Sequence, residues 1–370
     1  MISMKVCFLI NNLRFGGAER VCVSLCNHWA KTHQVTLVTT YSVATSIDFE
    51  LDPNISLLHL HETSNGTLNI WQKIKFCRNF FRTEDFDIVV SFLTNVNLIN
   101  IAASLGSNHK VVVSERTNPF SRQYQMSLRI LSYLFYPLAD SLVVQTLGLK
   151  EQYKKSNRLL SNIEVIPNPL SISNVPWLQK INEPPVHTAR KRIVCIGRFE
   201  KGKQFIEVLD VFKFLSKKHP GLTFCFIGDG SLRESLHARI SDLNMQEKID
   251  VLGFLPQPWE HMDQKEDIFL LPSKFEGFPN ALLEAMVMGV TSVAFDCPSG
   301  PKDISNQGQC AKLVPDGDFD LLFKELDELL NNPEYCDVLS RDGQAFVVRE
   351  YCQSRIHKKW DDLFLNLDCN

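Results

Sequence analysis

Two glutamates set eight residues apart, Glu276 and Glu284, form the pattern with the clearest chemistry in this sequence. The apolar run 268–273 before them is typical of a buried strand, and residues 281–288 have the spacing of a helix. Glu276 therefore falls on the connecting loop and Glu284 inside the helix. Each ionised carboxylate can accept two hydroxyl protons, so one could hold a sugar ring and the other a ribose diol.

The start of the same helix predicts a phosphate site. Pro279 and Asn280 open the helix, and the N–H groups of Asn280, Ala281 and Leu282 have no partner inside it. Together with the positive end of the helix dipole, these groups could seat a diphosphate between the two carboxylates, with Phe278 in the adjoining loop. The alternative is that the acids only decorate a helix N-terminus, where negative charge is favourable.

A second loop, residues 197–203, carries two cations after a predicted strand. Arg198 could fork two phosphate oxygens, and Lys203 would add a movable point charge. We expect the following helix to bring both near the loop of Glu276. The competing interpretation is a pair of solvated loop charges.

Glycine-rich turns follow two other predicted strands. Gly16 and Gly17 open a helix after the first strand and would let the backbone approach a ligand closely. Gly228 and Gly230 follow the strand at 222–227 and form a weaker candidate for donor binding. Either pair could instead be a simple tight turn.

Several other classes of site do not fit the sequence. Gly16 and Gly17 do not make GxGxxG, and the second strand ends in Thr39, Thr40 and Tyr41 without an acidic ribose partner, which disfavours a dinucleotide oxidoreductase. No Walker lysine motif is present. Asp85 and Asp87 resemble a metal-binding DxD but precede a strand, so we expect no metal site and no essential metal. The 11 cysteines lack any CxxC pair, which favours reduced, buried thiols.

Apolar runs alternate with helical segments along the whole chain, which predicts parallel strands buried on both faces. The fold class is therefore α/β, with two doubly wound Rossmann-like domains facing a central cleft. The runs lie at 5–10, 35–40, 87–92, 110–114, 141–146 and 163–167, and then at 192–197, 222–228, 249–254, 268–273, 291–296 and 311–315.

The proline-rich stretch between the two sets of strands marks a domain boundary. We expect an acceptor-binding N-terminal domain at 1–168, a linker at 169–190, and a nucleotide-sugar-binding domain at 191–344. The last segment, 345–370, has helical spacing and is expected to pack back onto the first domain.

Residues 68–82 contain no acid and predict a basic amphipathic helix. Lys75, Arg78 and Arg82 fall on one stripe, beside an apolar side that includes Cys77 and Phe81. The stripe could meet an anionic, membrane-borne acceptor, or the helix could simply pack its apolar side on its own sheet.

Charge is unevenly distributed: residues 1–170 hold 16 Lys and Arg against 12 Asp and Glu, although the whole chain has a net charge of −3. The first half is therefore the one suited to an anionic membrane surface, and nothing suggests nucleic acid. Without a signal peptide or a membrane-spanning run, the expected location is cytoplasmic, with peripheral contact at the inner face of the membrane.

Taken together, these loops resemble those of glycosyltransferase family 4, which has the GT-B fold. The resemblance rests on Glu276 and Glu284, on Arg198 and Lys203, on the turn 16–20, and on the junction 165–169, in that family's order. The segments 91–95, 114–118 and 300–304 are similar to bacterial enzymes that extend lipid-linked oligosaccharides, including N-acetylgalactosaminyltransferases.

The resemblance implies retaining transfer of a hexose or N-acetylhexosamine from a UDP-sugar to a saccharide carried on polyprenyl pyrophosphate. Arg198 and Lys203 would stabilise the departing diphosphate. Glu276 would hold hydroxyls of the donor sugar, Glu284 those of the ribose, and Gly16 with Gly17 would cover the phosphates. The reaction would be a front-face displacement without an enzymic nucleophile or a cofactor, and a double displacement through Glu276 is the alternative.

One position departs from the family, where many members have a histidine after the strand 110–114. Here Glu115 and Arg116 follow that strand; Glu115 could act as an acceptor-side base and Arg116 could bind acceptor phosphate, or the two could form an internal salt bridge. Other functions open to the same fold are a nucleotide-sugar epimerase, a glycan phosphorylase and a nucleotide-binding scaffold without turnover.

Overall fold

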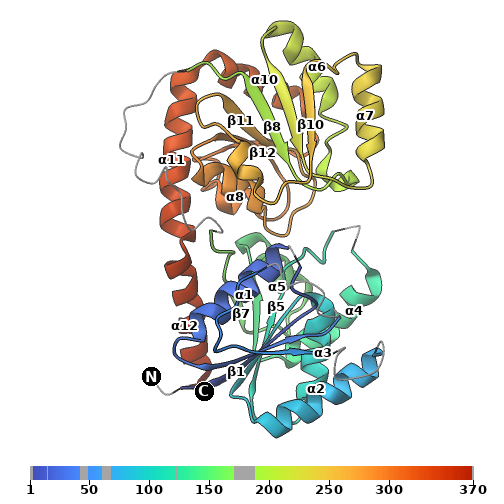
Figure 1. The fold of residues 1–370 in the computed structure, drawn as a ribbon, viewed down its shortest axis with the longest axis vertical. Coiled ribbons are helices and arrows are strands. Elements are labelled where there is room, and N and C mark those ends of the chain that lie inside the picture. Colours follow the sequence, from blue (N-terminus) through green and yellow to red (C-terminus); the bar gives the residue numbers. More distant parts are fainter. Residues whose placement is uncertain are drawn as a thin grey trace. The chain divides into compact units, whose positions relative to one another are not determined.

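The computed structural model of the chain describes residues 3–14, 16–41, 49–60, 68–121, 124–170 and 188–368. The chain divides into two compact domains (Figure 1): the first comprises 1–169 and 353–370, and the second comprises 170–352. The predicted pair of doubly wound α/β domains is confirmed. Most of the expected linker at 169–190 lies outside the described residues.

The first domain is built on a parallel sheet that, among the described residues, has seven strands in the order β3-β2-β1-β4-β5-β6-β7. The strands are β1 Lys5–Ile10, β2 Gln34–Thr39, β3 Ser56–His59, β4 Ile88–Phe92, β5 Lys110–Ser114, β6 Ser141–Val144 and β7 Ile163–Val165. The helices are α1 Gly17–Trp29, α2 Ile70–Glu84, α3 Thr94–Ser104, α4 Met126–Phe135, the short 3-10 turn η1 Tyr136–Leu138, α5 Leu147–Ser156 and α12 Gln353–Asp368.

Alternation along β1 explains why this sheet is covered on both faces. Phe8 and its alternate neighbours point toward α1 and α12, where Trp29 and Trp360 pack in one core. Cys7 and Leu9 point to the other face and pack with α2 and α3. The C-terminal helix therefore packs on the first domain; it begins at Gln353, whereas residues 345–351 belong to the preceding helix of the second domain.

The second domain repeats the scheme with a parallel sheet whose described strands number six, in the order β10-β9-β8-β11-β12-β13. The strands are β8 Arg192–Ile196, β9 Thr223–Ile227, β10 Ile249–Gly253, β11 Asp267–Leu271, β12 Thr291–Asp296 and β13 Lys312–Pro315. The helices are η3 Lys201–Lys203, α6 Leu209–Lys218, α7 Arg233–Asp242, η4 Pro258–His261, α8 Asn280–Val287, α9 Pro301–Ile304, α10 Phe319–Asn331 and α11 Pro333–Tyr351.

Candidate active site

The two loops that the sequence predicts to meet in the second domain do meet. Lys203 ends η3 after β8, and Glu276 lies between β11 and α8. The Nζ of Lys203 is 2.5 Å from Oε1 of Glu276, and the two side chains are 21% and 10% exposed. Lys274 N–H also donates to Gly202 O at 2.9 Å, so the backbones of the two loops are joined as well. If a phosphate replaces the carboxylate of Glu276 beside Lys203, the partly buried ammonium group still has an anionic partner.

Arg198 stands apart from this pair. Its side chain is 80% exposed, and its Nη1 lies 3.5 Å from Oε1 of Glu200, a contact that solvent screens strongly. The structure therefore leaves Arg198 free to swing onto an anion that reaches the loop. Cys297, which lies close to Glu276, is no rival nucleophile, because burial and that carboxylate raise the pKa of its thiol to about 12.

Helix α8 begins at Asn280, as predicted, and Glu284 lies inside it with only 7% of its surface exposed. The expectation of three free amides is wrong for two of them. Asn280 N–H donates to Phe278 O at 2.9 Å, and Leu282 N–H donates to Pro279 O at 3.1 Å. The tight turn that starts the helix therefore uses these two donors. An anion bound here would have to displace the turn's hydrogen bonds or bind the N–H of Ala281.

The glycines after β9 have a structural reason that the sequence did not reveal. A Cβ on Gly228 would lie 1.9 Å from Gly197 O, and one on Gly230 would lie 2.6 Å from Phe199 O. These glycines let the turn after β9 press against the backbone of the Arg198 loop. Close packing of two loops accounts for both glycines, and their contact with a donor stays a prediction.

Two further residues hold the site in place. Gln204 adopts a left-handed φ of 52°, and its Nε2 donates to Pro272 O and to Asp316 Oδ1, each at 3.1 Å. Ser299 Oγ donates to Gly277 O at 3.1 Å from the loop after β12. Glycine adopts this left-handed backbone more readily than glutamine does, so the hydrogen bonds of the Gln204 side chain are what favour it here, whereas nothing in the spacing of Ser299 indicates its contact.

In the first domain, Gly16 caps α1 and Gly17 begins it, as expected. Gly16 is extended, with φ of −167°, and its lack of a Cβ matters because Glu19 folds back against it. Burial raises the pKa of the Glu19 carboxyl. The N-terminus of α1 is therefore occupied by the chain's own carboxylate.

Glu115 is fully buried at the end of β5. Its Oε1 accepts from the N–H groups of Arg116 and Thr117 and from Thr117 Oγ1, and its Oε2 accepts from Thr94 Oγ1 and Tyr136 OH, both at 2.7 Å. With both oxygens engaged inside the domain, Glu115 has the contacts of a positioning residue. Its role as an acceptor-side base stays a prediction.

Arg116 does not form the expected salt bridge with the Glu115 side chain. Its Nη1 donates to Asn168 Oδ1 at 2.7 Å, and its guanidinium lies 5.1 Å from the Phe92 ring centroid and 5.9 Å from that of Trp360. Only 8% of the residue is exposed, and burial lowers its pKa to about 9. In this position Arg116 links the end of β5 to Asn168 and to the aromatic residues of β4 and α12, while its Nε and Nη2 are buried without a hydrogen-bond partner among the described residues, so its binding of acceptor phosphate stays a prediction.

The predicted basic helix is α2, and its stripe faces outward. Lys75 and Arg82 are exposed and Arg78 is half-buried, whereas Cys77 and Phe81 pack in the core. The apolar side therefore packs on its own sheet, as one interpretation held, and the cations remain available. Lys73, which we did not expect in the interior, is buried with its Nζ 3.1 Å from the centroid of the Tyr41 ring.

Within the described part of the chain, no three His, Cys, Asp or Glu residues are grouped so as to hold a metal ion. Asp87, from the DxD-like pair, accepts from Lys5 N–H at 2.7 Å, and Asp85 is the left-handed cap of α2. The ten described cysteines are free thiols. None of the described helices has the length and apolar character needed to cross a bilayer.

Both halves of the chain match known family models. Residues 15–174 match the model described as Glycosyltransferase Family 4, and residues 179–346 match Glycosyl transferases group 1. The two matches cover most of each Rossmann-like domain, including the loops of Gly16, Arg198 and Glu276.

Individual proteins similar to this chain are also glycosyltransferases. The chain is 31% identical over 277 residues to a lipopolysaccharide 1,6-galactosyltransferase of Salmonella typhimurium, covering 72% of this chain and 73% of the relative. It is 25% identical to a Campylobacter jejuni α-1,4-N-acetyl-D-galactosaminyltransferase whose name gives a diNAcBac-PP-undecaprenol-linked acceptor, over 96% and 97% of the two chains. A solved structure of Anabaena HepE with UDP and glucose superposes with a TM-score of 0.74 at 16% identity, covering 98% and 100%. The chain therefore belongs to glycosyltransferase family 4 and has the two Rossmann-like domains of the GT-B fold.

Proposed function

We propose that this glycosyltransferase moves a hexose or N-acetylhexosamine from a UDP-sugar to a saccharide linked to polyprenyl pyrophosphate, with retention of configuration, in the assembly of a bacterial surface glycan. The observation that carries the proposal is the Lys203–Glu276 pair, with exposed Arg198 on the same loop. A cation and a carboxylate held together in this way match a ligand that presents phosphate beside sugar hydroxyls.

In the proposed reaction, the diphosphate takes Glu276's place on Lys203 and is gripped by Arg198, which frees Glu276 for hydroxyls of the donor sugar. The bond from the anomeric carbon to the diphosphate oxygen breaks, and the acceptor oxygen bonds to that carbon on the same face. The leaving phosphate oxygen takes the acceptor proton. The two cations stabilise the charge that develops on the diphosphate, the largest electrostatic demand of this step.

The choice of nucleotide and acceptor is supported by the relatives. HepE is described in complex with UDP and glucose, and the Campylobacter enzyme is named for a lipid-linked acceptor. The exposed stripe of α2 adds cations on the acceptor domain of this chain.

The decisive experiment incubates purified protein with a panel of nucleotide sugars and a polyprenyl-pyrophosphate-linked saccharide, followed by product mass and anomeric configuration by NMR. We expect one sugar added from a UDP donor with retained configuration. Conversion of the UDP-sugar without acceptor would indicate an epimerase, dependence on inorganic phosphate would indicate a phosphorylase, and UDP binding without any transfer would indicate a scaffold.

Charge reversal on α2 tests the acceptor side separately. Arg78→Glu with Arg82→Glu should raise KM for the lipid-linked acceptor at least about tenfold, because about 1 kcal/mol of attraction to an anionic surface is lost per cation and two like charges are added. A short, water-soluble saccharide acceptor should be used equally well by variant and parent. Unchanged kinetics with the membrane-borne acceptor would remove α2 from acceptor binding.

A further inference from the structure

Helix α4 presents large apolar side chains to solvent. Met126 is 63% exposed, Ile130 53% and Leu134 58%, whereas Ser132 on the inner side is only 2% exposed. A helix of a globular domain normally buries its apolar stripe, and an apolar patch on a surface marks an interaction site. We call this patch the α4 face; it consists of Met126, Ile130, Leu131, Tyr133, Leu134 and Leu138.

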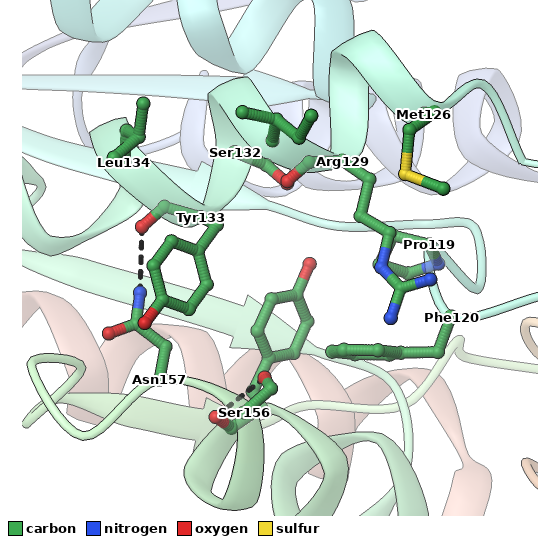
Figure 2. A pocket seen from close by; sticks show the side chains of 11 residues that line it. Pro119, Phe120, Met126, Arg129, Ser132, Tyr133, Leu134, Ser156 and Asn157 are labelled. Atoms are coloured by element: carbon green, nitrogen blue, oxygen red, sulfur yellow. Dashed lines mark hydrogen bonds between the residues drawn. The ribbon is translucent and has the colours of Figure 1, made fainter.

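The α4 face borders a pocket of about 350 Å³ (Figure 2). Met126, Tyr133 and Leu134 form its wall on α4. The opposite wall comes from Phe120 and, at the end of α5, from Tyr153, Ser156 and Asn157. Asn157 Nδ2 donates to Tyr133 O at 2.7 Å, which ties the two walls together. The pocket therefore continues the apolar surface inward, between two walls that a hydrogen bond joins.

Cations lie beside this apolar surface. Arg129 holds its guanidinium 5.4 Å from the Phe120 ring centroid at the pocket (Figure 2), and three exposed cations, Lys154, Lys155 and Arg158, follow at the end of α5. With Lys150 they make five cations in residues 124–160, against Asp140 and Glu151. Asp140 is already engaged, because its carboxylate accepts from Val111 N–H at 2.8 Å and lies 3.7 Å from Lys110 Nζ.

We propose that the α4 face docks on the surface of an anionic phospholipid bilayer. Apolar side chains on a short helix, an aromatic residue such as Tyr133 among them, and a rim of Lys and Arg are the combination that binds at the boundary between headgroups and acyl chains. A second copy of the chain is a poor occupant, since a twofold contact through this face would place the cationic rims near one another.

Docking here has a consequence for the rest of the first domain. Tyr124 precedes α4 and Tyr136 follows it, and their hydroxyls donate to Thr94 and Glu115 at the carboxyl ends of β4 and β5. The docked helix is thus bonded at both ends to that edge of the sheet. The inference goes beyond the proposed reaction, because docking requires neither donor nor acceptor.

Vesicle sedimentation tests the docking surface. The full chain should bind phosphatidylcholine vesicles that contain phosphatidylglycerol, and binding should weaken with salt and on pure phosphatidylcholine. Ile130→Glu with Leu134→Glu should reduce binding at least about tenfold, because two apolar groups are lost and two like charges are added at an anionic surface. Lys154→Glu with Lys155→Glu should reduce binding and flatten its salt dependence.

The matched control places the same change on equally exposed apolar residues elsewhere: Phe214→Glu with Leu252→Glu, at positions 58% and 45% exposed in the second domain, should bind vesicles like the parent. All variants should keep the parent Tm and its rate with a soluble acceptor. The proposal is overturned if the α4 variant binds vesicles as the parent does, if the control loses as much binding, or if the α4 variant only abolishes a dimer in solution.

Discussion

At the scale of single residues, the Lys203–Glu276 pair makes the proposed site testable by small changes. Glu276→Gln keeps the shape but removes the charge, and Lys203→Ala removes a cation that would meet the departing diphosphate. Each change should lower turnover at least about tenfold, about 1.4 kcal/mol in the activation barrier. Steady-state assay against the identified donor checks this.

Lys201→Ala is the control for that pair, since Lys201 lies on the same 3-10 turn but is exposed and should tolerate the change with turnover within about twofold. Near-parent rates in both site variants would remove the second-domain loops from catalysis.

Glu115 leads to a different kind of prediction, because its contacts are internal. Glu115→Gln replaces one accepting oxygen with a donor and leaves hydroxyl or amide protons without a partner. We expect a cost of about 1–3 kcal/mol in the free energy of unfolding and a loss of turnover smaller than tenfold. Thermal denaturation together with kcat distinguishes the two effects.

Tyr136→Phe deletes two hydrogen bonds of the same network, the one donated to Glu115 and the one accepted from Asn97, and should cost about 1–3 kcal/mol, again with little effect on kcat. A hundredfold loss of turnover in Glu115→Gln at unchanged Tm would instead support the catalytic role.

Some of these residue contacts could be predicted from the sequence and others could not. Glu276 and Lys203 were predictable, because the loops that carry them follow adjacent parallel strands, β8 and β11, and the ends of such strands meet. The contacts of Glu115 and Arg116 were not, since the tertiary structure decides whether a polar side chain after a strand points into the domain. Gly228 was predicted as a donor-binding glycine, but its close contact with the backbone of Gly197 could not be predicted, because the two residues are far apart in sequence.

At the scale of elements, α12 is held to α1 by a polar cluster that should respond to pH. His28 Nε2 lies 3.2 Å from Asp361 Oδ2, Trp29 Nε1 donates to Asp361 Oδ1 at 2.7 Å, and the rings of His28 and His357 are 4.3 Å apart. Burial, and then the neighbouring His28, lower the pKa of His357 to about 4. Burial alone would raise the pKa of Asp361, but hydrogen bonds from His28 and Trp29 lower it.

His357 takes up a proton less readily in the folded chain than in the unfolded one. An unfolded histidine takes a proton near pH 6.5, whereas folded His357 resists until about pH 4, so protons favour the unfolded chain across this window. Stability should therefore fall as pH drops from about 6.5 to 4, and Asp361 should add a further loss below its unfolded pKa. Tm measured against pH should show a shallower fall for His357→Gln than for the parent.

His237→Gln, at an exposed histidine of α7, is the control and should follow the parent curve. Parallel curves for parent and His357→Gln would show that the cluster does not sense pH.

Some of the strands and helices could be predicted from the sequence and others could not. Buried parallel strands such as β5 and β12 were predicted to the residue, because continuous apolar runs mark them. The edge strand β3 was missed, since Ser56–His59 is short and half-exposed. The break between α11 and α12 was also missed: helical spacing runs through it, but Tyr351 O accepts from Leu170 N–H and Cys352 turns extended.

At the scale of the whole molecule, positive charge is in excess in the first half of the chain and negative charge in the second half. The four surplus cations of residues 1–170 lie in the part that carries α2 and the α4 face, and residues 171–370 hold seven more acids than bases. In a segment with surplus negative charge, the proposed diphosphate would depend all the more on the two loop cations, Arg198 and Lys203.

The two loop cations predict that turnover needs no divalent ion. Arg198 and Lys203 can together offset the charge of the departing diphosphate, and the DxD-like Asp87 is already bonded to the Lys5 backbone. Treatment with EDTA should therefore leave the rate within about twofold of the untreated enzyme, and Mg²⁺ should not rescue Lys203→Ala. A collapse of turnover in EDTA that Mn²⁺ or Mg²⁺ restores would mean that an ion, rather than the loop cations, carries the leaving-group charge.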